Sequence, residues 1–507
     1  MQQRIAGMKN KDTNKKLILS SCFKDNFIAD MTVFNKEKTF FDLNKIETPM
    51  LDALEKALQN PTVPLHIPGH AGGAGILPKF KDLFGERIIN LDYTDEFSGL
   101  GKLYPSDGPI ARAQELMAEL FNAEKSFFLI NGSSVGNLAL ALTVAKENKK
   151  LVIGRNCHRS VIAGLTLTGA NPVWIVPKWL EKWGIWGHVN PAEIEKVLDE
   201  NSDVSAVWIT NPTYEGVVSD VEKIASICKQ RGVILIVDEA HGCLWNFSDK
   251  LPLAALECGA DAVVHSLHKT GGSFSQSSVL HIAKESKINV DDVDANLGML
   301  QSTSPSCTLL ASLDAARAYL SSEYGRQRVD YAIKNAEAVR EILDNIDGVN
   351  CLSAKNGSDL DVTKIYITVD GLSGKRLQSI LEIEYNIEIE TATDEGILAL
   401  SNIGNTSEQL YYFCECIKNI AKENYSDITH LEKIKYMPLH VPEIVCTPRK
   451  AYISEKEKVK PEDGIGRISA EIVAVCPPGI PVLVPGEMIT EAHLPYLNNR
   501  HFIQVVK

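Results

Sequence analysis

The sequence Ser-Leu-His-Lys at residues 266–269 follows the apolar run Ala-Val-Val at residues 262–264. This order predicts that Lys269 lies at the end of a buried strand, where its ammonium group is poorly solvated. A lysine at a strand end can simply extend its side chain to water. A desolvated lysine, however, also loses its proton readily, and the free amine can form a Schiff base with an aldehyde cofactor. Ser266 and His268 would then be placed to donate hydrogen bonds to a cofactor phosphate.

An aspartate upstream of this lysine favours the cofactor interpretation. Residues 233–237 are apolar and mostly β-branched, which predicts a central strand buried on both faces, as in a parallel sheet. Asp238 follows at the carboxyl end of that strand, where ligands bind in open α/β sheets. A buried aspartate needs a cationic partner, and a protonated pyridine nitrogen is one. Asp238 and Lys269 on neighbouring strand ends would therefore bracket a pyridoxal ring.

Two further loops follow predicted strands. A strand at residues 126–130 leads into a loop of small residues at 131–137 and then into a predicted helix. The exposed amides and the dipole of a helix N-terminus attract anions, so this loop is a candidate phosphate site. A second strand at residues 151–153 precedes His158, whose imidazole could stack on a cofactor ring, although a histidine at a strand end is more often structural.

Together these segments resemble the Orn/Lys/Arg decarboxylases, a family of fold-type-I pyridoxal-phosphate (PLP) enzymes, and are most like its short biosynthetic arginine decarboxylases. The similarity extends from about Thr48 to the C-terminus, and the order and spacing of its motifs are highly specific. The motifs that carry it are His-Ile-Pro-Gly-His at 66–70, Asn-Gly-Ser-Ser at 131–134, Asn-Cys-His at 156–158, Thr-Asn-Pro-Thr-Tyr-Glu-Gly at 210–216, Asp-Glu-Ala-His at 238–241, Ser-Leu-His-Lys at 266–269, Pro-Pro-Gly-Ile-Pro at 477–481 and Pro-Gly-Glu at 485–487.

The resemblance implies a role for each candidate residue of the cofactor site. Lys269 would bind PLP covalently, Asp238 would pair with the pyridine nitrogen, and His158 would stack on the ring. His241 would lie near the phenolic oxygen. Lys269 or His268 would return a proton to the substrate, so the predicted catalytic residues are Lys269, His268 and His158. The residues expected to hold the phosphate are Ser133, Ser134, Ser266 and His268.

The resemblance also implies that the active site is shared between subunits. Residues 301–306, and Ser304 among them, resemble a segment that reaches the cofactor site of the partner subunit. We therefore expect a homodimer or a larger homo-oligomer with its active site at the interface.

The implied reaction is the decarboxylation of a basic L-amino acid. Arginine to agmatine, an entry to polyamine synthesis, is the first expectation, with lysine second and ornithine third. A carboxylate should bind the cationic end of the substrate. Two departures from the family pattern bear on the substrate: Ala71 stands where relatives have a lysine, and residues 92–105 match only loosely. The candidate substrate-binding acids are Asp95, Glu96 and Glu487.

The order of predicted elements sets the fold class. Between about residues 60 and 310 strands alternate with helices, which predicts an α/β fold with a largely parallel, doubly wound sheet. By resemblance this is the aspartate-aminotransferase-like large domain of fold type I. We expect an extension with a linker helix at 1–60, the PLP-binding domain at 61–310, a smaller α/β domain at 311–430 and a C-terminal decarboxylase domain at 431–507. The seven expected strands are 126–130, 151–153, 173–176, 206–209, 233–237, 262–264 and 278–281.

The composition is that of an ordinary soluble globular protein, with 44% hydrophobic and 23% charged residues among 507. A net charge of -13 argues against nucleic-acid binding and mildly favours a cationic ligand. The 11 cysteines lack a framework spacing, which predicts reduced thiols in the cytoplasm and no metal site. No apolar run approaches the ~18 residues that span a membrane.

Other enzyme classes share parts of this pattern. Residues 132–136 match the G-x-S-x-G elbow of α/β-hydrolases, with Ser134 as nucleophile and with Asp238 and His268 following in the hydrolase order. A hydrolase leaves Lys269 and His158 unexplained. Residues 238–241 also spell a helicase motif, but the sequence has no matching P-loop. A PLP-dependent aminotransferase is the main alternative that uses the same cofactor, and a catalytically inactive relative is another.

Overall fold

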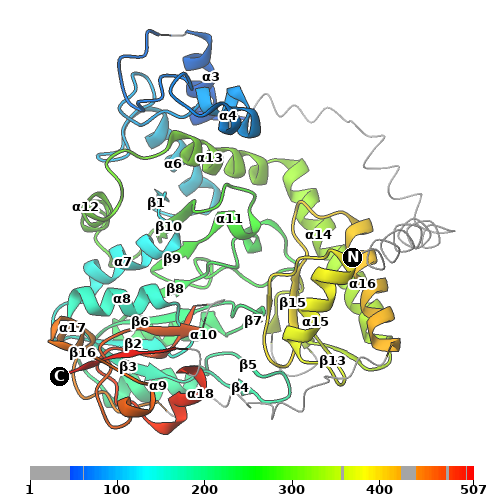
Figure 1. Ribbon diagram of the computed structural model, residues 1–507. Coiled ribbons are helices and arrows are strands. Elements are labelled where there is room, and N and C mark those ends of the chain that lie inside the picture. The colour runs from blue at the N-terminus through cyan, green and yellow to red at the C-terminus, as the bar shows by residue number, and fades with distance from the viewer. Residues whose placement is uncertain (1–45, 61, 355–358, 424–440, 476–478, 498–499) are drawn as a thin grey trace.

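The computed structural model describes residues 46–60, 62–354, 359–423, 441–475, 479–497 and 500–507. Figure 1 shows a central sheet domain, a smaller domain beside it, the N-terminal helices at one end and the C-terminal segment at the other. The predicted extension at residues 1–45 lies outside the described residues. Within the described residues no helix is both long enough and apolar enough to cross a membrane.

A seven-stranded sheet forms the centre of the large domain, in the order β1-β10-β9-β8-β6-β2-β3. Strand β10 pairs antiparallel with both of its neighbours, and the pairings among β9, β8, β6, β2 and β3 are all parallel. The predicted fold class is confirmed, and each predicted strand is present. The strands are β1 Lys125–Leu129, β2 Lys150–Gly154, β3 Asn171–Ile175, β6 Val204–Thr210, β8 Ile234–Asp238, β9 Ala262–His265 and β10 Ser278–Ile282.

Both faces of this sheet are buried, which explains why its strands are apolar runs rather than alternating patterns. In β6, Trp208 packs in the hydrophobic cluster of helices α7 and α8, while its neighbours Val207 and Ile209 pack in the cluster of α9 and α10 on the opposite face. The helices of the large domain are α6 Gly108–Leu120, α7 Gly132–Val144, α8 Arg159–Thr168, α9 Pro191–Glu200, α10 Val221–Arg231, α11 Leu267–Thr270 and α12 Val290–Leu300.

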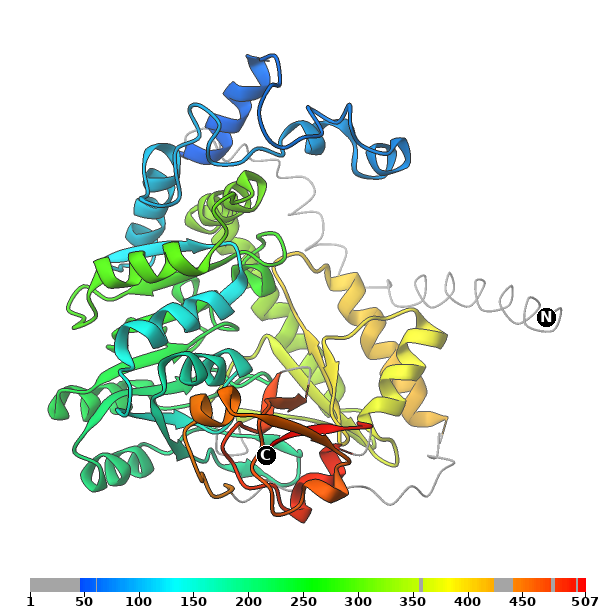
Figure 2. The same cartoon turned by 60° about the vertical axis from the view of Figure 1, so that its left-hand side comes forward.

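The smaller domain follows two long helices, α13 Cys307–Ser321 and α14 Glu323–Asp344. Apolar residues recur at helical spacing in the sequence at positions 332, 336, 339 and 343, and all four are buried on one face of α14. A four-stranded antiparallel sheet in the order β11-β13-β15-β14 packs beside α14, as Figure 2 shows in yellow. Its elements are β11 Val349–Cys351, β13 Lys364–Val369, α15 Gly374–Ile380, β14 Thr391–Ala392, β15 Ile397–Leu400 and α16 Ser407–Lys422.

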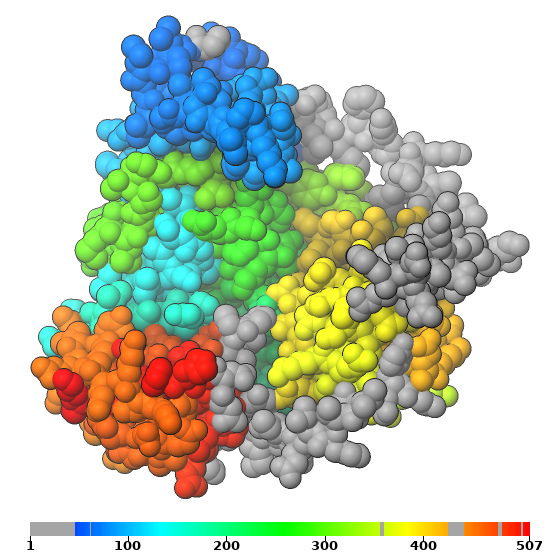
Figure 3. Space-filling view, in the orientation of Figure 1, coloured from blue at the N-terminus to red at the C-terminus, as the bar shows by residue number. Residues whose placement is uncertain are grey.

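The C-terminal segment packs against the large domain near α8 (Figure 3). The charged run at residues 455–458 lies mostly in β16 and is largely exposed. Part of the expected C-terminal domain, residues 431–440, lies outside the described residues. The elements are α17 Pro448–Ile453, β16 Lys456–Val459, β17 Val473–Val475, β18 Ile480–Leu483, α18 Leu494–Leu497 and β19 Ile503–Val506.

Large apolar side chains are exposed in the N-terminal segment. Leu65 is 93% exposed, Leu83 79% and Val63 78%. Exposed apolar groups gathered in one region mark an interaction surface more often than isolated ones do. The helices at this end are α3 Pro49–Gln59, α4 Pro78–Phe84 and α5 Glu86–Asn90.

Close packing of α7 on α8 sets the position of the loop that precedes α7. A Cβ atom added to Gly164 of α8 would lie 2.6 Å from the Cβ of Ala141 in α7, well inside van der Waals contact. Gly164 is therefore required by the distance between the two helices.

We expect Gly164→Ala to destabilise the protein. Overpacking costs about 1–3 kcal/mol, which outweighs a gain in helix propensity of about 1 kcal/mol. Thermal unfolding should show a lower Tm. Gly404→Ala is the control, since a Cβ there meets no atom within 4 Å. An unchanged Tm for Gly164→Ala would contradict the close helix contact.

Candidate active site

A cavity of about 320 Å³ opens at the carboxyl edge of the large sheet. It lies where β6, β8 and β9 end and where α7 and α8 begin. The structure brings to it every residue predicted to contact the cofactor from its own chain. These are Ser133, Ser134, His158, Asp238, His241, Ser266, His268 and Lys269.

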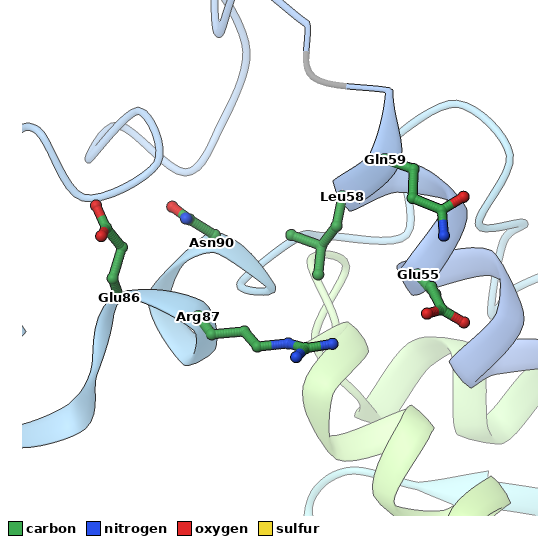
Figure 4. A pocket seen from close by; sticks show the side chains of 6 residues that line it. All are labelled: Glu55, Leu58, Gln59, Glu86, Arg87 and Asn90. Carbon is green, nitrogen blue, oxygen red and sulfur yellow. The ribbon is translucent and has the colours of Figure 1, made fainter.

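A second hollow, of about 470 Å³, lies between α3 and α5 (Figure 4). Arg87 extends across it from α5 toward α3, and the other side chains surround an open space. None of the predicted cofactor residues lines it, so we place the active site at the sheet edge. The lining residues of this hollow are Glu55, Leu58, Gln59, Glu86, Arg87 and Asn90.

Lys269 lies in α11, a single helical turn that directly follows β9. The prediction of a strand-end lysine is thus corrected by a few residues, because the backbone turns at Ser266 and the Lys269 amide donates to the Ser266 carbonyl. Burial lowers the pKa of Lys269, although the charges of Asp238 and Glu390 oppose that shift. The amine is therefore easier to deprotonate than an exposed lysine, as a nucleophile must be.

His241 is the direct partner of this amine. Its Nε2 atom lies 2.8 Å from Lys269 Nζ. Burial keeps the pKa of His241 well below its usual value, and the positive charges of Lys269 and Lys364 lower it further. The neutral imidazole can accept a hydrogen bond from Lys269, and its Nδ1 atom has no partner among the described residues.

Asp238 ends β8 and is only 3% exposed. Its carboxylate accepts hydrogen bonds from Asn137 Nδ2 at 3.0 Å and from the Ala240 amide at 3.3 Å. Both donors are neutral, and a buried carboxylate is further stabilised by a cation. Strands β8 and β9 are parallel neighbours in the sheet, so Asp238 and Lys269 lie at the same carboxyl edge, as predicted.

A chain of hydrogen bonds joins Asp238 to His158. Asn137 Nδ2 also donates to Ser160 Oγ at 2.9 Å, and Ser160 Oγ lies 2.7 Å from His158 Nδ1. The Ser160 amide donates to the same nitrogen, so His158 caps the N-terminus of α8. Burial lowers the pKa of His158, which favours the neutral aromatic ring that stacking requires.

Small polar groups line the end of the cavity where α7 begins. Ser133 Oγ and Ser266 Oγ lie 2.7 Å apart and connect the α7 loop to the β9 loop. His268 Nδ1 lies 2.8 Å from the Ser277 carbonyl, so the single proton of a neutral imidazole is used there. His268 can donate to a phosphate only when it is also protonated on Nε2, a state that a bound dianion would favour.

These residues fit PLP in their donor chemistry. Helix α7 is 13 residues long, and its N-terminus with the serines suits a phosphate. Asp238 suits a pyridinium, and Lys269 suits an aldehyde. Buried polar atoms of Asn156 and Thr210 also line the cavity and have no hydrogen-bond partner within the part of the chain that the structure describes.

Three residues of the site were missed from the sequence alone. Asn137 links Asp238 to Ser160 as described above. The Tyr214 ring packs edge-on against His241 at 4.5 Å, and its hydroxyl donates to the Glu390 carboxylate of the smaller domain. Glu215 lines the cavity, and burial raises its pKa to about 7. Tyr214 and Glu215 belong to a motif that the sequence did reveal, but Glu390 carries no local signal.

The predicted substrate acids do not line the cavity of their own chain. Asp95 is buried and accepts from the Leu103 amide at 2.9 Å, and burial raises its pKa. Glu96 is exposed. Glu487 is fully buried in an ion pair with Arg155 at 3.2 Å. Burial raises the pKa of Glu487 although Arg155 opposes the shift.

Ser304 is exposed and also lies outside this cavity. The strip at 301–306 runs beside the segment that carries Glu96, since Thr94 and Ser306 form an antiparallel bridge. Two surface segments that the sequence linked to the substrate and to the partner subunit are therefore adjacent.

Comparisons with known proteins show the family to which the chain belongs. A lysine and an aspartate at the carboxyl edge of such a sheet define the fold-type-I class of PLP enzymes. The family model "Orn/Lys/Arg decarboxylase, major domain" matches residues 48–369, and the model of the C-terminal domain matches residues 431–505. The chain belongs to the Orn/Lys/Arg decarboxylase family and is a decarboxylase.

Individual relatives cover nearly the whole chain. The arginine decarboxylases of Halalkalibacterium halodurans and Bacillus subtilis are each 35% identical over 463 residues, which is 90% of this chain and 94% of theirs. The solved structure of lysine decarboxylase A from Pseudomonas aeruginosa has a TM-score of 0.81 at 20% identity and covers 96% of this chain and 84% of that one. At that identity the solved structure supports the fold.

We expect Asp238→Asn to lower kcat by about 100-fold or more. A lost buried charge interaction of about 3 kcal/mol corresponds to that factor. The rate of CO2 release from the preferred basic amino acid is the measurement. Asp249→Asn, at an exposed aspartate, is the control and should leave kcat unchanged. Retention of half the wild-type kcat by Asp238→Asn would contradict its role.

Proposed function

We propose that the protein catalyses PLP-dependent decarboxylation of L-arginine to agmatine and CO2, as an entry to polyamine synthesis. The observation that carries the cofactor is the pairing of a desolvated Lys269 with a buried Asp238 across one cavity, and the match to the Orn/Lys/Arg decarboxylase family supports decarboxylation as the reaction. The choice of arginine is supported by the two relatives named arginine decarboxylase. Lysine is the second candidate and ornithine the third.

PLP, when bound, would accept the electron pair of the bond between Cα and the carboxylate, so that CO2 can leave. Asp238 would hold a proton on the pyridine nitrogen, and His158 would pack against the ring. Lys269 would bind the aldehyde, be displaced by the substrate amine, and then donate a proton from its ammonium group to Cα. Lys269 suits this last step better than His268, because the His268 Nδ1 proton is engaged by the Ser277 carbonyl.

A hydrolase mechanism has less support. Its triad would need Asp238 to orient His268 beside Ser134. Asp238 instead accepts from Asn137 and Ala240, and His268 is bonded to the Ser277 carbonyl. An aminotransferase would share the cofactor, and product analysis separates it from a decarboxylase.

We also propose a homodimer in which residues 301–306 and Glu96 of one subunit reach the cavity of the other. The exposed apolar side chains at Val63, Leu65 and Leu83 support a partner over this end of the molecule. In this arrangement Glu96 is an acid available to bind the cationic end of the substrate. Ser304 belongs to the 301–306 segment and keeps its predicted role in this proposal. Asp95 and Glu487 are buried and bonded to Leu103 and Arg155 of their own chain, so neither is free to bind the substrate. A cytoplasmic location is supported by the free cysteines of the described residues.

Sedimentation analysis tests the dimer. We expect the mass of two chains for the wild type and a shift toward one chain for Leu65→Asp/Leu83→Asp, because charges in an apolar interface oppose association. Activity should fall together with the dimer. A monomer that is fully active would contradict a shared active site.

Substrate choice has a direct test. The PLP-loaded protein is incubated separately with arginine, lysine and ornithine, and CO2 and amine products are measured. We expect release from arginine with at least a 10-fold preference in kcat/KM, which corresponds to about 1.4 kcal/mol. Release from lysine alone would move the assignment to the second candidate, and a keto-acid product without CO2 would favour an aminotransferase.

A further inference from the structure

A second buried lysine lies behind the cofactor cavity. Lys364, the first residue of β13 in the smaller domain, is 1% exposed. Its Nζ atom donates to the His241 carbonyl at 2.8 Å, to Asp361 Oδ2 at 2.9 Å and to Thr363 Oγ1 at 3.2 Å. An ammonium group has three donors, and all three are used here. This lysine does not extend to solvent, and it is not among the residues that line the cavity.

Its partner Asp361 is held equally firmly. Trp245 Nε1 donates to Asp361 at 2.8 Å, and the Thr363 amide donates at 2.9 Å. The Asp361 amide in turn donates to the Gly216 carbonyl at 2.8 Å. The ion pair therefore connects the start of β13 to two loops of the large domain, the loop before β7 (Val217–Val218) and the 3₁₀ turn at Trp245–Phe247.

His241 connects Lys364 to the amine of Lys269. Lys364 fixes the backbone carbonyl of His241, while the imidazole of His241 lies 2.8 Å from Lys269 Nζ. The Tyr214 ring also packs edge-on against that imidazole. A shift of the His241 backbone would break a hydrogen bond to a buried ammonium group, which is costly.

We propose that Lys364 is a positioning residue for the reaction. From the smaller domain it holds the backbone of His241, so that the imidazole keeps Lys269 at the reactive end of the cavity. This inference rests on the proposed PLP chemistry, but none of the roles assigned above includes Lys364 or Asp361. The pair also couples the placement of the smaller domain to the geometry of the active site.

The charges around Lys269 allow the role of Lys364 to be tested by a pH titration as well as by turnover. Asp238 from β8 and Glu390 from the smaller domain raise the pKa of Lys269, whereas burial and the charge of Lys364 lower it. The neighbouring imidazoles are His241, His158 and His268. Removing the Lys364 charge removes a lowering effect, so the pKa of the group on Lys269 should rise. The absorbance band of the cofactor bound to Lys269 should then titrate at higher pH.

Two substitutions separate the hydrogen bond from the charge. Lys364→Met keeps most of the length of the side chain and removes both, and Lys364→Gln, of the same length as Met, keeps a donor that can point to the His241 carbonyl. We expect Lys364→Met to lower kcat roughly 10- to 100-fold, as misplacement of a reactive group does, with KM changed less than about 3-fold. Lys364→Gln should recover most of kcat while its absorbance midpoint stays shifted upward.

The control is Lys375→Met, which removes an exposed lysine paired with Asp394 in the same domain. It should change neither kcat nor the midpoint. If Lys364→Met does not fold, the double variant Lys364→Met/Asp361→Asn removes the unpaired buried charge, and its kcat and KM are measured in place of those of Lys364→Met, while the absorbance midpoint is read from Lys364→Gln.

Wild-type kcat and an unshifted midpoint in a folded Lys364 variant would overturn the inference and leave only a structural role. Failure of the proposed decarboxylase function can be distinguished from failure of the inference about Lys364. If the wild type releases no CO2 from any basic amino acid, the absorbance midpoints of the wild type and the variants still decide whether Lys364 acts on Lys269.

Discussion

The burial of ionisable groups at one edge of the large sheet is the constraint on which the rest of the structure depends. Asp238 and Lys269 follow neighbouring strands whose apolar side chains pack on both faces, so neither group is freely solvated. Buried ionisable groups persist only where neighbours satisfy them. Asn137 supports Asp238, His241 supports Lys269, and a bound cofactor with a cationic ring and an aldehyde would complete the set.

The strands of the large domain could be predicted because both faces of that sheet are covered. A strand such as Val204–Thr210 must then be apolar along its length, and the sequence shows this without any knowledge of its neighbours. The smaller domain gave weaker signals, because strands such as β11 and β14 are only two or three residues long. Its helix α14 was evident because four buried residues recur at helical spacing.

Some residues of the active site could likewise be predicted from the sequence, and others could not. Ser133, Asp238, Ser266 and Lys269 lie at the carboxyl ends of strands or a few residues beyond them, so their meeting at one edge follows from the topology. Glu390 and Lys364 come from the smaller domain and reach the site through Tyr214 and His241. No local pattern marks such contacts, because they depend on how two domains pack. The substrate acids were harder still, since the shared active site that we propose would draw on a second chain.

Chemical trapping of the cofactor tests the central claim most directly. The PLP-loaded protein is reduced with borohydride, digested, and its peptides are mapped by mass spectrometry. Our account predicts that the phosphopyridoxyl group is found on Lys269 alone. Its attachment to another lysine, in particular to the buried Lys364 nearby, would contradict the account and would require a different active site.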